Sequence, residues 1–196
     1  MFVTHSIELP RGALRVLQPE ESAELPDDGA VEWAPLAPYW SVLWRSGVEL
    51  ARELDGVELR GKRVVELGCG LAVPSIAAAR AGAQVLATDS DPEALELVAE
   101  NAAANDVTIE TAAVDWAHPD ELVSRAPFDL VLAADVLYER ASVALLLSLL
   151  PRLAPEAWLA DPGRPAAAAF LEQARVRWPL ETRARGVVQL HRLQLA

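Results

Sequence analysis

Residues 64–72 read VVELGCGLA, an apolar run that ends in the carboxylate of Glu66 and a turn that contains Gly68 and Gly70. Glycines let the backbone turn sharply and approach a ligand closely, and the helix expected after the turn offers free N–H groups. Position 73, where the dinucleotide-binding fingerprint has its third glycine, is Val73, and no Lys-Ser/Thr pair ends a phosphate-binding loop here. Taken alone, the motif also fits a plain tight turn between a strand and a helix.

A carboxylate follows at the end of the next expected strand. Asp89 lies roughly 20 residues beyond Gly70, where a carboxylate can accept hydrogen bonds from both hydroxyls of a ribose. Its alternative role is to cap the following helix, but Asp91 stands directly before Pro92 and is better placed for that. Asp89 is therefore expected to remain available to a ligand.

The charges around the turn favour one nucleotide over another. A carboxylate such as Glu66 directly before the glycines would repel a pyrophosphate, but it suits a ligand with an ammonium and a sulfonium group. S-adenosylmethionine carries both. Asp115 and Trp116 end the third expected strand and can offer adenine an acceptor for its amino group and a flat apolar surface. The alternative is a solvated aspartate beside a core tryptophan.

Alternating strands and helices must position these side chains. Apolar runs predict strands at 62–67, 83–89, 107–116, 128–138 and 157–161, then two closing strands at 180–184 and 186–193. Helical spacing predicts helices at 72–82, 91–105, 142–153 and 166–177, and an earlier one from 41 to 54.

Ser41 is the expected N-cap of that first helix. The whole pattern indicates an α/β fold with a doubly wound, mostly parallel sheet of seven strands and an antiparallel C-terminal edge. The carboxyl ends of parallel strands meet at one edge of the sheet, where ligands bind. The acidic residues at four successive strand ends should gather there: Glu66, Asp89, Asp115 and Asp135.

Composition narrows the class of protein. The 196 residues suggest one domain, and a net charge of −12 argues against a nucleic-acid surface. The single cysteine, Cys69, excludes an internal disulfide and a cysteine zinc site. The three histidines, His5, His118 and His191, are far apart in the sequence, so no metal site is expected.

No targeting or membrane segment is expected either. The first thirty residues carry several glutamates and lack the apolar core of a signal peptide. The most apolar stretch, 141–150, is too short to span a bilayer and stops at Pro151. The expectation is a cytoplasmic protein without a membrane partner. Residues 18–38 are rich in proline and acidic residues and are expected to be irregular.

The runs VVELGCGLA, ATD, VDW and DVLY together resemble the class I, seven-strand S-adenosylmethionine-dependent methyltransferases, which have a Rossmann-like fold. PYWSVLWRSGVELA at 38–51 and the Asp-x-x-Tyr motif at 135–138 are similar to family 16 of that class, which contains lysine methyltransferases of non-histone proteins. DPGRP at 161–165 resembles the branch that methylates the electron transfer flavoprotein beta subunit. The resemblance implies a methyltransferase domain over 38–196 and an N-terminal lead-in extension over 1–37.

The resemblance also implies roles for individual residues. It implies an S-adenosyl-L-methionine site formed by eight residues: Trp44, Glu66, Gly68, Cys69, Gly70, Asp89, Asp115 and Trp116. It implies that Asp135 and Tyr138 lie beside the substrate amine. An ordinary aspartate is too acidic to deprotonate lysine efficiently, so Asp135 is expected to orient the ammonium and Tyr138 to hydrogen-bond it.

The aromatic residues before the turn are candidates for the walls of the pocket. Tyr39, Trp40 and Trp44 can offer aromatic faces to a cationic amine. Trp40 is an equally good candidate for the hydrophobic core.

Competing functions remain open at this point. The first is methylation of an exposed lysine on a protein, and the second is N-methylation of a small amine, nicotinamide-type or other, on the same scaffold. The third is a cofactor-binding scaffold without turnover, against which the joint presence of Glu66, Asp89, Asp135 and Tyr138 argues. An NAD dehydrogenase is disfavoured by Val73 and Glu66.

Overall fold

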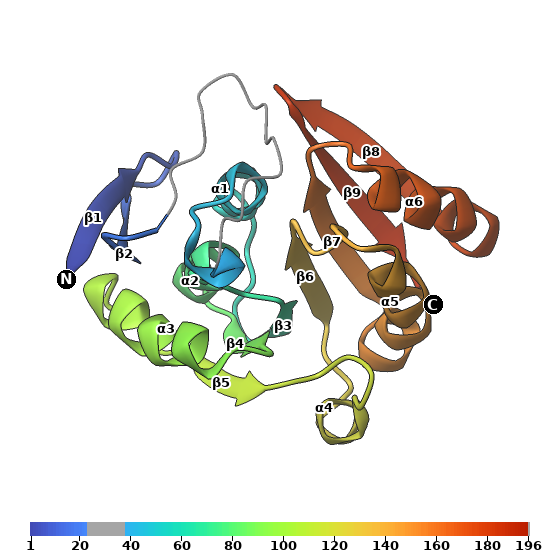
Figure 1. The fold of residues 1–196 in the computed structure, drawn as a ribbon, viewed down its shortest axis with the longest axis horizontal. Coiled ribbons are helices and arrows are strands. Elements are labelled where there is room, and N and C mark those ends of the chain that lie inside the picture. The colour runs from blue at the N-terminus through green and yellow to red at the C-terminus, as the bar shows by residue number, and fades with distance from the viewer. Residues whose placement is uncertain (23–37, 196) are drawn as a thin grey trace.

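The structure is a computed structural model that describes residues 1–22 and 38–195. Its centre is a seven-stranded sheet with the order β5-β4-β3-β6-β7-β9-β8, and a separate two-stranded hairpin lies to one side (Figure 1). The sheet strands are β3 (Arg63–Leu67), β4 (Gln84–Asp89), β5 (Glu110–Ala113), β6 (Leu130–Ala134), β7 (Glu156–Asp161), β8 (Leu180–Arg185) and β9 (Val188–Gln194). The helices are η1 (Tyr39–Ser41), α1 (Arg45–Leu54), α2 (Val73–Arg80), α3 (Pro92–Ala104), α4 (Asp120–Ser124), α5 (Arg140–Leu153) and α6 (Pro165–Arg177).

The sheet has the predicted topology. Strands β3 to β7 pair in parallel, whereas β9 is antiparallel to both β7 and β8. From β3 the chain winds outward through β4 to β5, and it then returns to place β6 on the other side of β3. The crevice at this reversal, outside the carboxyl ends of β3 and β6, is where doubly wound sheets bind ligands. The α/β class and the antiparallel C-terminal edge are confirmed.

Helices cover both faces of the sheet. Helices α1, α2 and α3 lie on one face, and α5 and α6 lie on the other (Figure 1). Two large clusters of buried side chains correspond to these layers, one around Leu50 and Ile76, the other around Leu146 and Phe170. Because both faces are covered, the central strands carry apolar runs that are buried on both faces, and Val64 and Val65 are both fully buried. None of the helices within the described ranges has the length and apolar character needed to cross a membrane.

The start of α1 differs from the prediction. The helix begins at Arg45, its N-cap is Trp44, and that residue forms no side-chain capping bond. Ser41 instead belongs to the short helix η1, and Val42 after it is extended, which interrupts the helical path. The Ser41 hydroxyl donates to the Pro38 carbonyl at 2.9 Å, so it does not cap α1. The predicted N-cap was therefore wrong.

Residues near the N-terminus form an antiparallel hairpin of β1 (Phe2–Ile7) and β2 (Leu14–Pro19). Ile7, Leu14 and Val16 are buried in the same apolar cluster as α1 and α2. The hairpin thus shares the core of the sheet domain. The prediction of an N-terminal lead-in extension did not anticipate this packing. Most of the stretch expected to be irregular, 18–38, lies outside the described residues, and the domain boundary after residue 37 stays a prediction.

Candidate active site

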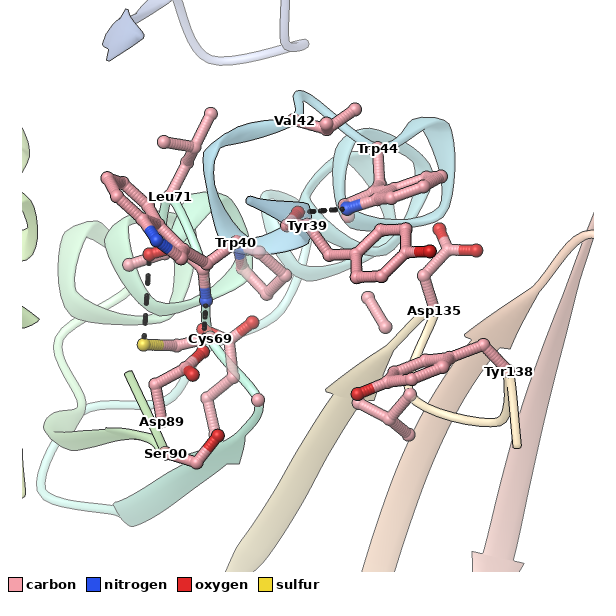
Figure 2. Close-up of a pocket in the computed structure, with 18 of the residues that line it drawn as sticks. Tyr39, Trp40, Val42, Trp44, Cys69, Leu71, Asp89, Ser90, Asp135 and Tyr138 are labelled. Atoms are coloured by element: carbon pink, nitrogen blue, oxygen red, sulfur yellow. Dashed lines mark hydrogen bonds between the residues drawn. The ribbon is translucent and has the colours of Figure 1, made fainter. Parts of the chain in front are cut away.

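A cavity of about 250 Å³ opens at the carboxyl ends of β3, β4 and β6. All ten residues selected from the sequence line it: Trp44, Glu66, Gly68, Cys69, Gly70, Asp89, Asp115, Trp116, Asp135 and Tyr138. In Figure 2, Cys69 and Asp89 lie on one side, and Trp44, Asp135 and Tyr138 lie on the other. The parallel topology has therefore brought together residues that are up to 94 positions apart in the sequence.

The glycine turn is packed closely against the chain itself. Gly68 and Gly70 have φ angles of +64° and +48°, in the left-handed region that favours glycine. A Cβ atom at Gly70 would lie only 2.8 Å from the carbonyl oxygen of Trp40, and one at Gly68 would lie 3.0 Å from Val136 Cγ1. Both glycines therefore shape the cavity by letting η1 and the segment after β6 approach the turn.

Glu66 lies at the base of the cavity and is 1% exposed. Its Oε2 atom accepts two hydrogen bonds from Ser75, one from the backbone N–H at 2.9 Å and one from the hydroxyl at 2.5 Å. Burial raises the pKa of Glu66 to about 8, against the lowering effect of the Ser75 bonds. A cation bound beside this carboxyl would favour its ionised form, which is the chemistry of a site for an ammonium or sulfonium group.

Asp89 is the last residue of β4 and forms a hydrogen bond with the glycine turn. Its Oδ2 atom accepts the Gly70 N–H at 2.9 Å, and its Oδ1 atom accepts the Asp91 N–H at 3.1 Å. Each carboxylate oxygen has a second lone pair, so both can still accept a hydroxyl from a ligand in the cavity. Asp91 caps α3 by accepting the Glu93 N–H at 2.9 Å, as the sequence predicted.

Trp116 and Asp115, the proposed adenine pair, have different surroundings. Trp116 is half-buried, packs on the core, and would touch a Cβ atom at Gly68. Asp115 is exposed and accepts hydrogen bonds from His118 Nδ1 and the Ala117 N–H, and the bond from His118 is the main reason that its pKa is lowered. Trp116 can therefore provide a flat wall, whereas Asp115 already has two partners of its own.

Asp135 follows β6 directly and is buried beneath the cavity rim. Its φ angle of +57° is unusual for a residue with a side chain, and its N–H donates to the Ala160 carbonyl at 2.9 Å. Its Oδ1 atom accepts a hydrogen bond from Arg164 Nη2 at 2.8 Å. The guanidinium of Arg164 also lies 5.3 Å from the Trp44 ring centre. The sequence reading quoted the DPGRP motif around Arg164 but did not select this residue for the site.

Two tyrosines stand at the mouth of the cavity. The rings of Tyr39 and Tyr138 are 6.0 Å apart between centres, and both residues are more than 40% exposed. Trp44 Nε1 donates to the Tyr39 carbonyl at 3.0 Å and so ties this rim to α1 (Figure 2). Trp40 lines the cavity and also packs on the core, which combines the two roles considered for it. Within the described residues no group of three or more metal-binding side chains occurs.

Known proteins with similar sequences are methyltransferases, which agrees with the chemistry of the cavity. The sequence model of the family described as "Lysine methyltransferase" matches residues 39–158. The chain is 34% identical over 120 residues to the protein N-lysine methyltransferase METTL21A of Danio rerio, covering 58% of this chain and 55% of that one. It is also 34% identical over 141 residues to the electron transfer flavoprotein beta subunit lysine methyltransferase of Xenopus laevis, covering 67% of this chain and 55% of the relative.

A solved structure supports the fold over nearly the whole length. The ribosomal protein L11 methylase of Lactobacillus delbrueckii subsp. bulgaricus superimposes with a TM-score of 0.67 at 20% identity, over 97% of this chain and 98% of the other. This chain spans about half the length of the curated relatives that it matches. Since the family model covers more than half of the chain, this protein belongs to the lysine methyltransferase family.

Proposed function

We propose that this chain transfers a methyl group from S-adenosyl-L-methionine to a lysine side chain of a protein. One observation carries the proposal: in a member of the lysine methyltransferase family, Glu66, Asp89 and Asp135 converge on a single cavity beside the glycine turn. The net charge of −12 also supports a cationic acceptor rather than a nucleic acid. A cytoplasmic location stays a prediction from the sequence.

The chemistry of the cavity fits the cofactor. S-adenosylmethionine would supply an electrophilic methyl group on a positively charged sulfur. Glu66 is a buried carboxyl whose ionised form a nearby cation would stabilise. Asp89 keeps free lone pairs for ribose hydroxyls, and Trp116 offers an aromatic wall to a base.

The other side of the cavity suits an amine. Methyl transfer requires a neutral nitrogen in line with the leaving sulfur, so positioning contributes much of the rate. The nitrogen lone pair would form the new N–C bond as the S–C bond breaks, with that electron pair left on sulfur, and the methylated product would remain an ammonium near neutral pH. Asp135 would bind and orient the arriving ammonium, and the Tyr138 hydroxyl would hydrogen-bond the nitrogen. Lysine normally carries a proton near neutral pH, so its proton has to leave for water first.

The test uses methyl-labelled S-adenosylmethionine with the purified full chain and a lysate of the source organism, resolved on a gel. We expect a discrete labelled protein band that is lost with Asp135→Ala. Acid hydrolysis of that band should release the label as methyllysine. Asp120→Ala provides a matched control, because Asp120 is an exposed carboxylate on α4 and does not line the cavity. The control should label the band as the unmodified chain does.

Other outcomes separate the remaining candidates. Label found only in small molecules would replace the proposal with a small-amine N-methyltransferase. Cofactor binding without any transfer would favour the scaffold.

A further inference from the structure

Two carboxylates and one guanidinium lie together under the acceptor side of the cavity. Arg164 Nη2 is 2.8 Å from Asp135 Oδ1, and Arg164 Nε is 4.0 Å from Asp161 Oδ2. The exposed fractions of the three side chains are only 15%, 5% and 2% for Arg164, Asp135 and Asp161. With both carboxylates ionised the cluster carries a net charge of −1, which leaves a place for one more cation.

The pairing in this cluster is incomplete. Arg164 Nε and Asp161 Oδ2 are both buried and have no hydrogen-bond partner, although they face each other at 4.0 Å. Buried polar atoms are normally satisfied, and leaving them unpaired is costly. A movement of about 1 Å would bring these two atoms to hydrogen-bonding distance. Arg164 therefore has a second carboxylate within reach of the one that it now contacts.

The backbone holds this alternative in place. Asp161 Oδ1 accepts the N–H groups of Gly163 at 2.6 Å and Arg164 at 2.8 Å, so the carboxylate is fixed against the turn before α6. The centre of the Trp44 ring lies 5.3 Å from the guanidinium carbon of Arg164. Only the end of the Arg164 side chain has to move to change partners.

We propose that Arg164 is a positioning residue that exchanges carboxylates during acceptor binding. It neutralises Asp135 before the acceptor arrives, and it turns to Asp161 when the acceptor ammonium pairs with Asp135. The inference rests on the proposed function and adds the means by which a buried carboxylate is kept for an incoming cation. It also keeps a positive charge beside the bound amine, which favours release of the amine's proton to water before methyl transfer.

The surrounding titratable groups fit this exchange. Burial raises the pKa of Asp161 to about 6, against the bonds from Arg164 and Gly163. A closer Arg164 would stabilise the ionised form. On the cavity side lie Tyr39 from η1 and Tyr138 after β6, and the pKa of Tyr138 is raised, chiefly by burial and then by Glu139. The carboxyl groups of Asp135 and Asp161 lie within 4.0 Å of the Arg164 guanidinium nitrogens.

The first test compares pH profiles of kcat and KM for the protein acceptor. Arg164→Met removes the charge and keeps much of the length, and Arg164→Lys keeps the charge. Arg152→Met on α5 is the control for loss of an arginine, because Arg152 is exposed and pairs only loosely with Asp120. The rise of kcat with increasing pH reports loss of the proton from the bound amine. We expect Arg164→Met to shift this rise to a higher pH by about one unit. Arg164→Lys should restore most of the profile, and Arg152→Met should not change it.

A purely structural role would give a different pattern. It would lower kcat by the same factor at every pH, and the lysine variant would do no better than the methionine variant. Either result would overturn the proposal.

A second measurement needs no turnover. The Arg164 Nε–H resonance, assigned by its loss in Arg164→Lys, is followed by NMR in the full chain saturated with S-adenosylhomocysteine. The probe is Nα-acetyl-lysine-N-methylamide, and its control is the analogue with a hydroxyl in place of the amine. We expect the amine alone to shift this resonance and protect it from exchange. Asp161→Asn, which keeps an oxygen for the two backbone N–H groups, should abolish the protection.

The two measurements separate the two hypotheses. Protection by the amine without methyl transfer to any acceptor would overturn the proposed function and support the exchange. Methyl transfer with an unmoved Arg164 resonance would overturn the exchange and leave the function intact. A chain that shows neither would refute both.

Discussion

Ser75 donates both its backbone N–H and its hydroxyl to the same oxygen of Glu66, at 2.9 and 2.5 Å. The two residues are buried, one in β3 and the other in the first turns of α2, on either side of the glycine turn. These two hydrogen bonds fix the carboxyl group of Glu66 at the base of the cavity. The same burial gives Glu66 its raised pKa of about 8.

Glu66 makes the stability of the ligand-free protein depend on pH. The pKa of Glu66 is about 8 in the folded chain, compared with an ordinary value of 4.5. Between these two pH values the folded chain therefore binds one proton more than the unfolded chain. Its stabilising contribution is complete below pH 4.5 and is lost as the pH rises through 8. Glu66→Gln removes this dependence and should flatten the decline by up to about 1.4 kcal/mol per pH unit. Urea unfolding at several pH values measures it, with exposed Glu121→Gln as the control. An unchanged slope would show that Glu66 does not hold the proton.

The same substitution tests the cofactor side of the cavity. Glu66→Gln keeps an oxygen for Ser75 but removes the charge that a bound cation would favour. We expect affinity for S-adenosylmethionine to fall about tenfold or more, measured by calorimetry near neutral pH. S-adenosylhomocysteine has the ammonium group but a neutral sulfur, and it should lose less affinity. If Glu66→Gln binds both ligands as tightly as the unmodified chain does, Glu66 does not contact the cofactor.

Gly70 is the glycine whose replacement should be most damaging. An alanine there would place its Cβ 2.8 Å from the Trp40 carbonyl, at a φ angle of +48°. The left-handed backbone alone costs an alanine about 1–2 kcal/mol, and the contact with a backbone oxygen adds to it. Gly61→Ala is the matched control, since Gly61 has a φ angle of +74° and nothing within 4 Å of its Cβ position. Thermal unfolding should show a larger loss for Gly70→Ala, and similar losses would mean that the close approach is easily relieved.

His191 gives stability a pH dependence of the opposite sign. It is buried in β9, its Nδ1 atom lies 2.9 Å from the Thr182 hydroxyl, and burial lowers its pKa from 6.5 to about 4. Stability is therefore lost as the pH falls from 6.5 towards 4, where the unfolded chain takes up the proton first. His191→Asn offers Thr182 another polar partner and should reduce the acid loss by about 1–3 kcal/mol. Denaturant titrations near pH 4.5 and 6.5 measure this, with exposed His118→Asn as the control. If both variants lose stability alike, His191 is not the group responsible.

The sequence predicted the sheet because its parallel strands are buried on both faces and therefore read as apolar runs. Once the strands are parallel, Glu66, Asp89 and Asp135 must meet at one edge of the sheet. The choice of Trp44 and Tyr138 came instead from the resemblance to the methyltransferase family. The pairing of Asp135 with Arg164 depends on how the turn before α6 packs beside β6. Spacing along the chain does not encode that contact, although the motif around Arg164 was visible.

Two local features show what the sequence reading missed. In the hairpin, buried Leu14 and Val16 alternate with exposed Arg15, and Gly12 precedes them at the turn. This strand pattern was present in the sequence and went unused. The start of α1 was a different error, because a serine before a helical pattern resembles an N-cap, whereas Ser41 already donates to the Pro38 carbonyl in η1.

Asn101 on α3 connects the hairpin to the loop that follows the glycine turn. Its Oδ1 atom accepts the Leu17 N–H at 2.7 Å, and its Nδ2 donates to the carbonyls of Leu17 at 3.3 Å and Leu71 at 3.2 Å. Leu71 lines the cavity. A ligand that restrains this loop should therefore also restrain the N-terminal hairpin, and weakening the hairpin should loosen the hold on that ligand, since an energetic coupling between two parts acts equally in both directions.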